Sequence, residues 1–588
     1  MIIRETMLKK ILLAIVVFGF SYSIALSQEQ RELDKEVKVR TTYQPKINKA
    51  FRLGKLPVIK DTSTFTPSFD YFIQAKPLNV GFSPAEIPAA KIVGEPLKKM
   101  NSHTLTLAGG NYSTLLGDYR FNNQRSKTAD IGVHLRHYSS NGKLKLEDDD
   151  KVKPDYTEQL AEVYGTAYLD EGKLSGKLFY KHSGFNYFGF PQLGDIEGTT
   201  TNLFPYDKQK LNNFGLNALY QSNFKDEDQL NFGLGLQYEN FSDDIDAKEN
   251  DILISGNARI RRGDAFWSLR SEFDYFATDG LNHWEDSNWV SERKTLKWSV
   301  KPQYLLQTGS FNLQLGVNAI LATGDDSETK LYPDVKVDFE AIDGIMSLFA
   351  GLNGDLKMNR YKDIAEENHF IYSGLNVLPS NEKYKLYGGI RGSLSSNSSF
   401  TLTAEYSAID NQYFFVKENV FVSGVGFAGY RSSNKLGVVY DDVNILRLGA
   451  EVTIVWSDKL ELNSAVWYNN YSMDKQKEAW HMPDFELEAN AKYQFTKDLT
   501  FQAGVNIMGS RSVATFNRGS LNNQLSLSVD NEKTLDAVYD LNIGANYSIS
   551  EHLSAFAQVN NMFADKYYQW DGYPSQGLNF LLGIKVNL

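Results

Sequence analysis

The sequence predicts an all-β protein: a transmembrane antiparallel β-barrel of about 22 strands, preceded by a short extended periplasmic segment. Three observations predict this fold. Apolar and polar residues alternate along many short stretches, which is the pattern of strands with one apolar face. Short turn motifs join these stretches two by two, and longer loops join one such pair to the next. Aromatic residues make up 13% of the 588 residues, which suits a barrel with aromatic girdles at both membrane interfaces.

The first 100 residues are predicted to lie outside the barrel. Lys9 and Lys10 precede the apolar run Ile11–Phe20, and small residues precede Gln28, so residues 1–27 read as a cleaved secretory signal peptide. Residues 28–100 contain seven of the chain's 15 prolines, and proline is excluded from central strands. The predicted organisation is therefore a signal peptide (1–27), a Pro-rich periplasmic leader without a full plug domain (28–100) and an outer-membrane barrel (101–588).

Charge separates the leader from the barrel. The net charge of -11 argues against nucleic acid as a partner. Counting charged side chains gives about +5 for residues 28–100 and about -18 for the rest of the mature chain. A short alternating stretch, with the segment that follows it, could add as a strand to the sheet edge of a partner protein. The candidates for partner docking are Val37, Val39, Tyr43 and Pro45. The alternative is a leader that lies partly inside the lumen.

From Ser102 onward the pattern alternates strand, long loop, strand and short turn. The first two strands are predicted at His103–Gly109 and Leu115–Asn122. Short turns belong on the periplasmic side and long loops outside, which fixes the direction of every strand. To keep every short turn on the periplasmic side, Asn411–Val443 is assigned to a long external loop with its own small hairpin. The predicted short turns are Asp170–Gly172, Lys225–Asp228, Arg262–Asp264, Thr308–Ser310, Ile342–Gly344, Ser395–Ser399, Ser457–Lys459, Thr496–Asp498 and Ser548–His552.

The alternation is clearest late in the chain. Apolar residues share one face of the predicted strands Leu446–Trp456, Phe485–Tyr493 and Leu535–Tyr547, opposite residues that include Arg447 and Glu486. A polar face with ionised groups of both signs is typical of a wet lumen. On the final strand the lipid-facing residues, which form the predicted membrane-insertion tail, are Phe580, Leu582, Ile584, Val586 and Leu588.

Motifs for chemistry are weak. The chain has no cysteine, and its eight histidines form no metal-binding pair, so neither an enzyme nor a cofactor nor a metal site is predicted. Gly424–Gly429 has the spacing of a dinucleotide-binding turn, but no helical pattern follows it, which favours an external loop. The acidic clusters Glu147–Asp150 and Asp243–Asp246 offer oxygen ligands for calcium, with solvated acidic runs as the alternative.

Aromatic residues gather in the predicted outer loops, where exposed aromatic patches mark binding sites. The alternative is that they pack within the loops or belong to an interfacial girdle. The candidates for ligand contact are Phe188, Phe190, Trp284, Trp289 and Tyr413.

The C-terminal segment also resembles TonB-dependent outer-membrane receptors. The resemblance rests on Asn560–Phe563, Lys566–Tyr568, Gly572–Pro574 and Gly577 before the closing strand, although Leu578 stands where that family usually has arginine. It implies an outer-membrane location and a role in transport. The leader, which is too short and proline-rich for that family's plug, resembles the leader of plug-less receptor-like barrels of Bacteroidota.

Two functions remain open. The first is a TonB-dependent receptor-like barrel that takes up a solute across the outer membrane. The second is a plug-less structural or assembly component of an outer-membrane protein complex. The expected partners are outer-membrane lipid, together with TonB-type energy-coupling proteins, a surface lipoprotein or other outer-membrane proteins.

Overall fold

The computed structural model describes residues 101–588 apart from short gaps. Within these residues no helix is long and apolar enough to cross a membrane. Residues 420–433 and 518–527 are described by their backbone. The residues outside the description are 1–100, 124–125, 147–150, 190–207, 224–226, 246, 280–291, 374, 376, 425–426, 522–523 and 565.

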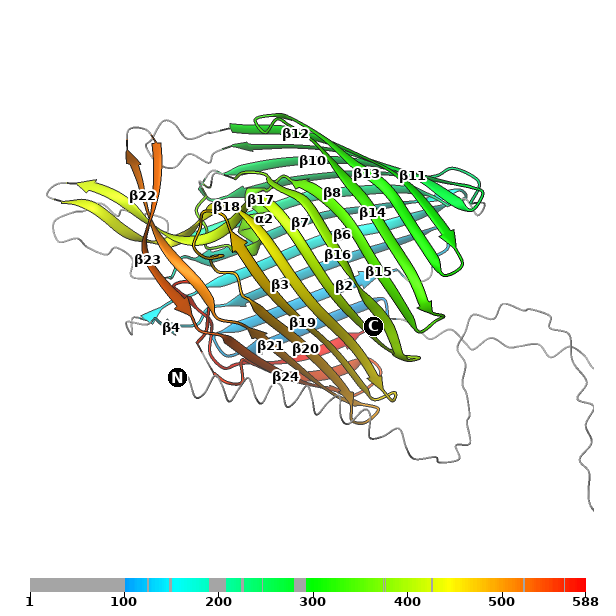
Figure 1. The fold of residues 1–588 in the computed structure, drawn as a ribbon. Coiled ribbons are helices and arrows are strands. Elements are labelled where there is room, and N and C mark those ends of the chain that lie inside the picture. Colours follow the sequence, from blue (N-terminus) through cyan, green and yellow to red (C-terminus); the bar gives the residue numbers. More distant parts are fainter. Residues whose placement is uncertain are drawn as a thin grey trace, which may run out of the picture. The chain divides into compact units, whose positions relative to one another are not determined.

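In the described part of the chain, 22 antiparallel strands form a closed barrel, as predicted (Figure 1). Each strand pairs with the next barrel strand in sequence. The barrel strands are β1 (His103–Gly110), β2 (Thr114–Asn122), β3 (Ala129–Ser140), β6 (Tyr156–Leu169), β7 (Gly172–Asn186), β8 (Lys208–Ser222), β9 (Asn231–Asp243), β10 (Lys248–Arg262), β11 (Ala265–Asp279), β12 (Glu292–Thr308), β13 (Phe311–Gly324), β14 (Glu328–Ile342), β15 (Met346–Lys357), β16 (Ser380–Ser395), β17 (Ser398–Gly424), β18 (Phe427–Trp456), β19 (Leu460–Met473), β20 (Phe485–Gln494), β21 (Leu499–Met508), β24 (Val538–Ser548), β25 (Leu553–Asn560) and β28 (Asn579–Asn587).

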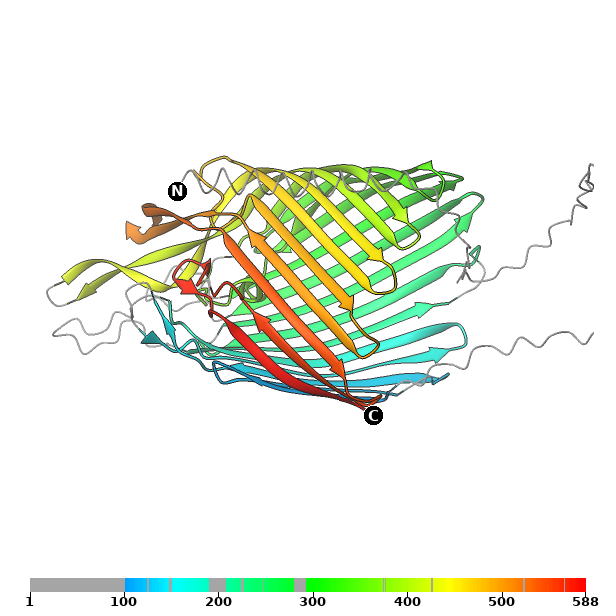
Figure 2. The same cartoon turned by 90° about the horizontal axis from the view of Figure 1, so that it is seen from below.

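The first and last strands close the barrel. β1 pairs antiparallel with β28 from Thr104 opposite Asn587 to Gly110 opposite Leu581, and the two strands lie side by side in Figure 2. The backbone N–H of His103 donates to the carbonyl of Leu588 at 2.9 Å, and the reverse bond measures 2.8 Å. Closure leaves no free strand edge at the seam, which is the condition for a sheet to span lipid.

The remaining elements lie in the loops at one end of the barrel, called here the outer end because the long loops gather there. Figure 1 shows the β17–β18 and β22–β23 hairpins extending past this end. The loop elements are β4 (Leu144–Lys145), β5 (Lys151–Val152), α2 (Tyr361–Glu367), β22 (Arg511–Leu521), β23 (Gln524–Leu535), β26 (Tyr568–Trp570) and β27 (Tyr573–Pro574).

The opposite end carries short turns at the predicted positions. Each predicted turn falls between two consecutive barrel strands, from β6–β7 to β24–β25. Gly263, Gly309 and Gly344 have φ values of 63°, 51° and 64°, in the left-handed region that glycine enters without a steric penalty. Both strands predicted at the start of the chain are confirmed to within one residue at each end.

The outer surface of the barrel is apolar. Leu448, Leu402 and Leu386 are among many exposed large side chains on the outward faces of the strands, where lipid replaces water as the contacting medium. A ring of exposed aromatic residues lies beside the short turns, as a membrane-interface girdle requires. Its members are Tyr168, Trp267, Trp456, Tyr493 and Tyr547.

The closing strand gives a direct test of this lipid-facing surface. Leu582, near the middle of β28, is 57% exposed. We expect Leu582→Lys to destabilise the barrel by roughly 2–4 kcal/mol, because a charge then sits near the bilayer midplane. Leu588→Lys, at the strand end, should cost only about 0–1 kcal/mol. The measurement is denaturant unfolding in lipid vesicles, and equal costs at both positions would contradict the assignment.

Two sequence predictions need correction. Asn411–Val443 is not a loop with a separate small hairpin: β17 and β18 run through it as strands of 27 and 30 residues. β-Bulges between Ile409 and Gln412 and between Lys417 and Asn419 bend the ribbon without ending it. The predicted strand Leu535–Tyr547 is two strands, because β23 ends at Leu535 and β24 begins at Val538.

Candidate functional site

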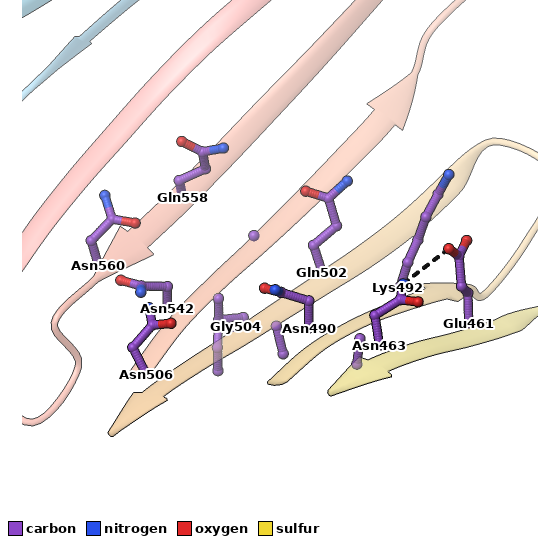
Figure 3. Close-up of a pocket in the computed structure, with 14 residues that line it drawn as sticks. Glu461, Asn463, Asn490, Lys492, Gln502, Gly504, Asn506, Asn542, Gln558 and Asn560 are labelled. Atoms are coloured by element: carbon purple, nitrogen blue, oxygen red, sulfur yellow. Dashed lines mark hydrogen bonds between the residues drawn. The ribbon is translucent and has the colours of Figure 1, made fainter. Parts of the chain in front are cut away.

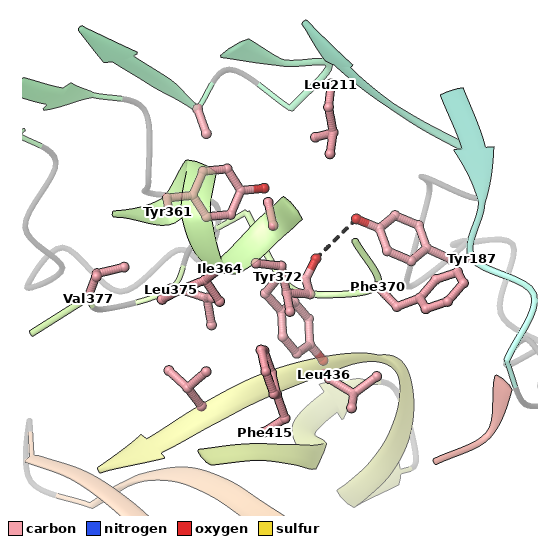
Figure 4. Close-up of a cluster of buried hydrophobic side chains, with 14 of the residues drawn as sticks. Tyr187, Leu211, Tyr361, Ile364, Phe370, Tyr372, Leu375, Val377, Phe415 and Leu436 are labelled. Atoms are coloured by element: carbon pink, nitrogen blue, oxygen red, sulfur yellow. Dashed lines mark hydrogen bonds between the residues drawn. The ribbon is translucent and has the colours of Figure 1, made fainter. Parts of the chain in front are cut away.

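Loops at the outer end of the barrel pack into one folded group, called here the cap. Its centre is the loop between β15 and β16, residues 358–379, which contains α2 (Figure 4). This loop packs against the outer ends of β7–β10 on one side and against β17 and β18 on the other. The buried apolar residues of the cap are Phe185, Tyr187, Leu211, Phe241, Ala247, Tyr361, Ile364, Ala365, Phe370, Ile371, Tyr372, Leu375, Val377, Phe415, Leu436, Val438 and Tyr573.

The sequence explains why this loop folds inward. Tyr361, Ile364 and Ala365 recur at helical spacing, so one face of α2 is apolar and is buried. After the helix the chain pairs with β18: Tyr372 N–H donates to the Leu436 carbonyl at 3.0 Å, and Leu436 N–H donates to the Phe370 carbonyl at 2.8 Å. The loop is therefore held between the two walls as an element of the fold.

Ion pairs hold the cap to the β9–β11 wall, and this set is called here the latch. Nη2 of Arg360 donates to both carboxylate oxygens of Asp274, at 2.6 and 2.7 Å, and Nη1 lies 3.0 Å from Asp251. Lys362 Nζ lies 2.5 Å from Glu239 Oε2. These side chains are at most 18% exposed, so solvent screens the pairs far less than it screens surface pairs.

A fourth carboxylate binds the start of the helix. The two oxygens of Glu249 accept from the backbone N–H groups of Tyr361 and Lys362, each at 2.8 Å. The first N–H groups of a helix have no partner within it, and a carboxylate there is favoured by the helix dipole. The latch thus joins two cations of the cap to wall carboxylates on three neighbouring strands.

The β25–β28 loop completes the cap on the far side. Tyr573 stacks on Phe370 with ring centroids 3.6 Å apart, and its hydroxyl donates to the Asn434 carbonyl. Tyr187 donates from its hydroxyl to the Ile371 carbonyl at 3.1 Å, the bond drawn in Figure 4. These contacts tie segments distant in sequence into one unit.

One buried histidine, His481, and one half-buried histidine, His369, lie within these loops. His481 accepts from Asp571 N–H through Nε2 at 3.3 Å, and its Nδ1 lies 2.7 Å from the Phe415 carbonyl. An imidazole that accepts at Nε2 carries its proton on Nδ1 and donates that proton to the carbonyl. His369 packs against Phe185 and Phe370 with centroids 4.6 and 4.0 Å away. Burial lowers the pKa of both rings to about 4.

Below the cap, the inner wall of β19–β25 carries a row of side-chain amides (Figure 3). They surround a hollow of 390 Å³ whose floor includes Gly504 and Gly544. A second hollow of 500 Å³ continues toward the cap, shares Asn506 with the first, and reaches Tyr567 in the β25–β28 loop. The amides of the first hollow, called here the carboxamide strip, are Asn463, Asn490, Gln502, Asn506, Asn542, Gln558 and Asn560.

The wall half-way round the barrel has a different character. A hollow of 660 Å³ there is lined by charged residues of both signs on β10–β16. They include Arg259, Arg270 and Lys301 with Asp334 and Glu382. The predicted lumenal face with ionised groups is thus confirmed for this wall, and the predicted inward side of β20 is confirmed by Glu486, Glu488, Asn490 and Lys492 in the other two hollows.

The structure brings two of the predicted ligand-contact aromatics into the cap. Phe188 makes edge contacts with Phe370 and Tyr573, and the hydroxyl of Tyr413 donates to Glu367 at 2.5 Å. This is the loop packing that the sequence left open as an alternative. Phe190, Trp284 and Trp289 lie outside the described residues.

The other predicted positions fall as follows. Val37, Val39, Tyr43 and Pro45 lie outside the described residues. The tail residues Phe580, Leu582, Ile584 and Leu588 are exposed and Val586 is half-buried, on the outward face of β28.

The candidate nucleotide and calcium motifs serve structural roles where they are described. Gly424–Gly429 spans the tip of the β17–β18 hairpin, with a strand on each side. The Asp243 carboxylate supports the cap: it accepts from Tyr361 at 3.0 Å and from the N–H groups of Ile245 and Ala247 at 2.9 Å. Residues 147–150 and 246 lie outside the description. Among the described residues, no group of three or more His, Asp or Glu is placed to hold a metal ion.

Sequence reasoning missed the latch. Arg360 and Lys362 flank the apolar helical face that starts at Tyr361 in a predicted outer loop. Such a pattern in an outer loop indicates that one face of the helix is buried against the barrel. This was the sequence signal from which the latch could have been suspected. The carboxylate partners lie more than 80 residues away, so no spacing in the sequence joins them to the loop.

Comparison with solved structures finds similar barrels. The siderophore receptor PirA from Acinetobacter baumannii matches with a TM-score of 0.60 and 11% identity, covering 84% of this chain and 81% of that chain. The FrpB iron transporter from Neisseria meningitidis matches at 0.61 and 11%, covering 84% and 82%. A mutant of the ferric enterobactin receptor from Pseudomonas aeruginosa matches at 0.59 and 14%, covering 83% and 81%.

No family model and no curated protein matches the sequence. Identities of this size establish a shared fold. The closed barrel, its apolar outer surface and its aromatic girdle independently require a membrane around it. The described part of the chain is therefore an outer-membrane β-barrel with the fold of solved siderophore and iron receptors.

Proposed function

We propose that this chain is a receptor-like transport barrel that takes up a solute across the outer membrane through a gated lumen. The observation that carries the proposal is the latch: a folded cap closes a polar lumen, and ion pairs attach the cap to one wall. Ion pairs can break and re-form without disturbing the barrel strands, and they act beside the apolar contacts that the cap makes with wall residues such as Leu211 and Phe241.

The comparisons support the class of function. The similar structures are described as siderophore receptors, an iron transporter and a copper transporter. Uptake by this chain is proposed on that likeness together with the gated lumen. The solutes named for those proteins are not assigned to this chain.

We further propose that the leader, residues 28–100, couples uptake to a TonB-type protein, without a standard plug and in the manner of Bacteroidota receptor-like barrels. Its docking residues would be Val37, Val39, Tyr43 and Pro45, whose alternating stretch suits addition to a sheet edge. Phe190, Trp284 and Trp289 are proposed as aromatic ligand contacts of the outer loops, and the β28 tail as the signal for membrane insertion.

The test compares solute uptake in cells with the full chain, without it, and with residues 28–40 deleted. Radiolabelled neutral oligosaccharides, peptides and ferric chelates serve as probes. We expect loss of the chain to abolish uptake of one probe class, and the deletion to reduce the same uptake at least tenfold. Unchanged uptake of all three classes without the chain would reject transport, and uptake that survives the deletion would reject coupling through that segment.

A structural role in an envelope complex is the second candidate, and one observation favours it. The β17–β18 and β22–β23 hairpins extend beyond the barrel and join through a parallel pairing, Lys417–Val420 beside Thr515–Arg518. Two linked ribbons form a stiff surface for another protein. Purification from native membranes separates the candidates, since only the structural role requires envelope proteins at fixed stoichiometry.

A further inference from the structure

The carboxamide strip has the features of a ligand-binding surface. Its side chains come from five neighbouring strands, β19, β20, β21, β24 and β25, and point into the same hollow (Figure 3). Gly504 and Gly544 leave room at its floor: Gly544 lies opposite Gln502 and Gly504 opposite Asn542 in the β21–β24 pairing. The hollow falls within the range of roughly 300–1,000 Å³ that is usual for small-molecule sites.

Part of the strip is free to bind. Asn463, Asn490 and Asn542 donate to neighbouring carboxylates. By contrast, within the part of the chain that the structure describes, no hydrogen bond to protein is formed by the side-chain amides of Gln502, Asn506, Gln558 or Asn560. A carboxamide presents two N–H donors and one carbonyl acceptor, so these four offer donors and acceptors together.

The strip differs from the opposite wall in charge. Glu461 and Lys492 are the charged members of its lining, and both lie near the periplasmic end. The wall of β10–β16 instead presents arginines, lysines and carboxylates. Arg447, Glu486, Glu488 and Asp540 line the adjoining second hollow, so the mostly uncharged surface is that of the first hollow. There a neutral solute meets groups that hydrogen-bond without requiring charge.

The position of the carboxamide strip also favours contact with a solute that enters the lumen. The second hollow joins the strip at Asn506 and ends beneath the cap at Tyr567 and Gln569. A solute released from the cap would therefore meet the strip next on its way down the wall. Trp467 and Met508 in this second hollow add apolar surface beside the amides.

We propose that the carboxamide strip binds a neutral, hydroxyl-rich solute, an oligosaccharide, during passage through the lumen. This rests on the proposed transport function and names its substrate class. Each sugar hydroxyl both donates and accepts, as each carboxamide does, and the C–H faces of sugar rings suit the neighbouring apolar surface. An extended peptide would gain most from a free strand edge, and the strands around the strip are paired on both sides.

The experiment measures binding to the purified full-length protein in detergent by titration calorimetry. The probes are maltohexaose, a hexamer of galacturonic acid and a neutral capped hexapeptide. The test variant is Gln502→Leu/Asn506→Leu, with Gln502→Ala/Asn506→Ala as a second version. The matched control is Asn257→Leu, a carboxamide on the charged wall. Gel mobility before and after heating checks that each barrel is folded.

We expect maltohexaose to bind and both double variants to weaken it at least tenfold, since each removes two or more hydrogen bonds. Asn257→Leu should bind as the native protein does. Absence of maltohexaose binding, equal binding by the double variants, or tighter strip-dependent binding of the charged hexamer or the peptide would overturn the assignment. If another probe class is taken up and maltohexaose does not bind, the proposal for the strip is rejected and the transport function is retained. If maltohexaose binds and no probe is taken up, the transport function is rejected and the proposal for the strip is retained.

Discussion

Arg360→Ala is expected to open the outer mouth of the barrel. The substitution leaves Asp251 and Asp274 facing one another without their shared cation. Removing one partner of a buried ion pair typically costs about 3–5 kcal/mol, and that cost falls on the closed cap alone. A shift of about 3 kcal/mol raises the open population by roughly two orders of magnitude. The measurement is single-channel conductance of the full-length protein in planar bilayers.

The controls separate gating from general damage. Arg270→Ala removes an arginine from the charged wall, away from the cap, and should leave conductance unchanged. Arg360→Lys keeps the charge but loses the second nitrogen, so it cannot bridge Asp274 and Asp251 as the guanidinium does, and an intermediate conductance is expected. A mouth that stays closed in Arg360→Ala, in a barrel that still shows heat-modifiable mobility, would show that the latch does not hold the cap.

Acidification is expected to weaken the contribution that two histidines of the same cap make to its closed state. Burial lowers the pKa of His369 and His481 to about 4, while a solvated histidine titrates near 6.5. For these two rings the opened state therefore binds more protons between these values, so their contribution to the closed state falls as the pH falls. Burial raises the pKa of the latch carboxylate Glu249 to about 7, and this group contributes in the opposite direction. The contribution is complete above about pH 6.5 and is lost toward pH 4. A shift of this size corresponds to about 3 kcal/mol for each ring.

The hydrogen bonds of His481 show which contact protonation disrupts. Protonation of His481 removes the acceptor that Asp571 N–H uses. The ionised groups around this ring are Asp571, Arg511 and Lys533, and Lys533 is already paired with Asp571 at 2.7 Å. We expect the native protein to conduct more at pH 5 than a variant that lacks the two rings.

A double variant isolates the two rings. His369→Phe keeps an aromatic ring, and His481→Asn keeps a side-chain N–H at a backbone φ of 62°, which asparagine tolerates. At pH 5 this pair should conduct less than the native protein, whereas His552→Asn at a periplasmic turn should match the native protein. A response that persists in the double variant would place the titrating group elsewhere.

The sequence predicted the barrel well because its signals are local. Alternation along β28 and the turn at Gly263 each depend on a few adjacent residues, so strand faces, turns and the even count of strands followed. The continuation of β17 and β18 past the membrane was missed, because strands that extend beyond the barrel need no lipid-facing alternation.

The cap could not be predicted in the same way. Its residues come from segments between Phe185 and Tyr573, and only the folded barrel brings these together. Each polar contact of the latch joins residues 86 or more apart in sequence. Phe188 and Tyr413 were predicted as ligand-contact aromatics of the outer loops, and the structure places Tyr413 on β17. Their neighbours decide between packing and recognition, and those neighbours are set by the tertiary structure.

The seam between β1 and β28 has a consequence for how the chain folds. The hydrogen bond from Thr104 to Asn587 joins residues 483 apart, so the pairing that completes the barrel joins the two ends of the described part of the chain. Distant pairings form slowly, because a long loop must close first. Until they form, both end strands present free edges that can pair with other chains. The chain therefore depends on protection from aggregation for the whole interval between export and closure.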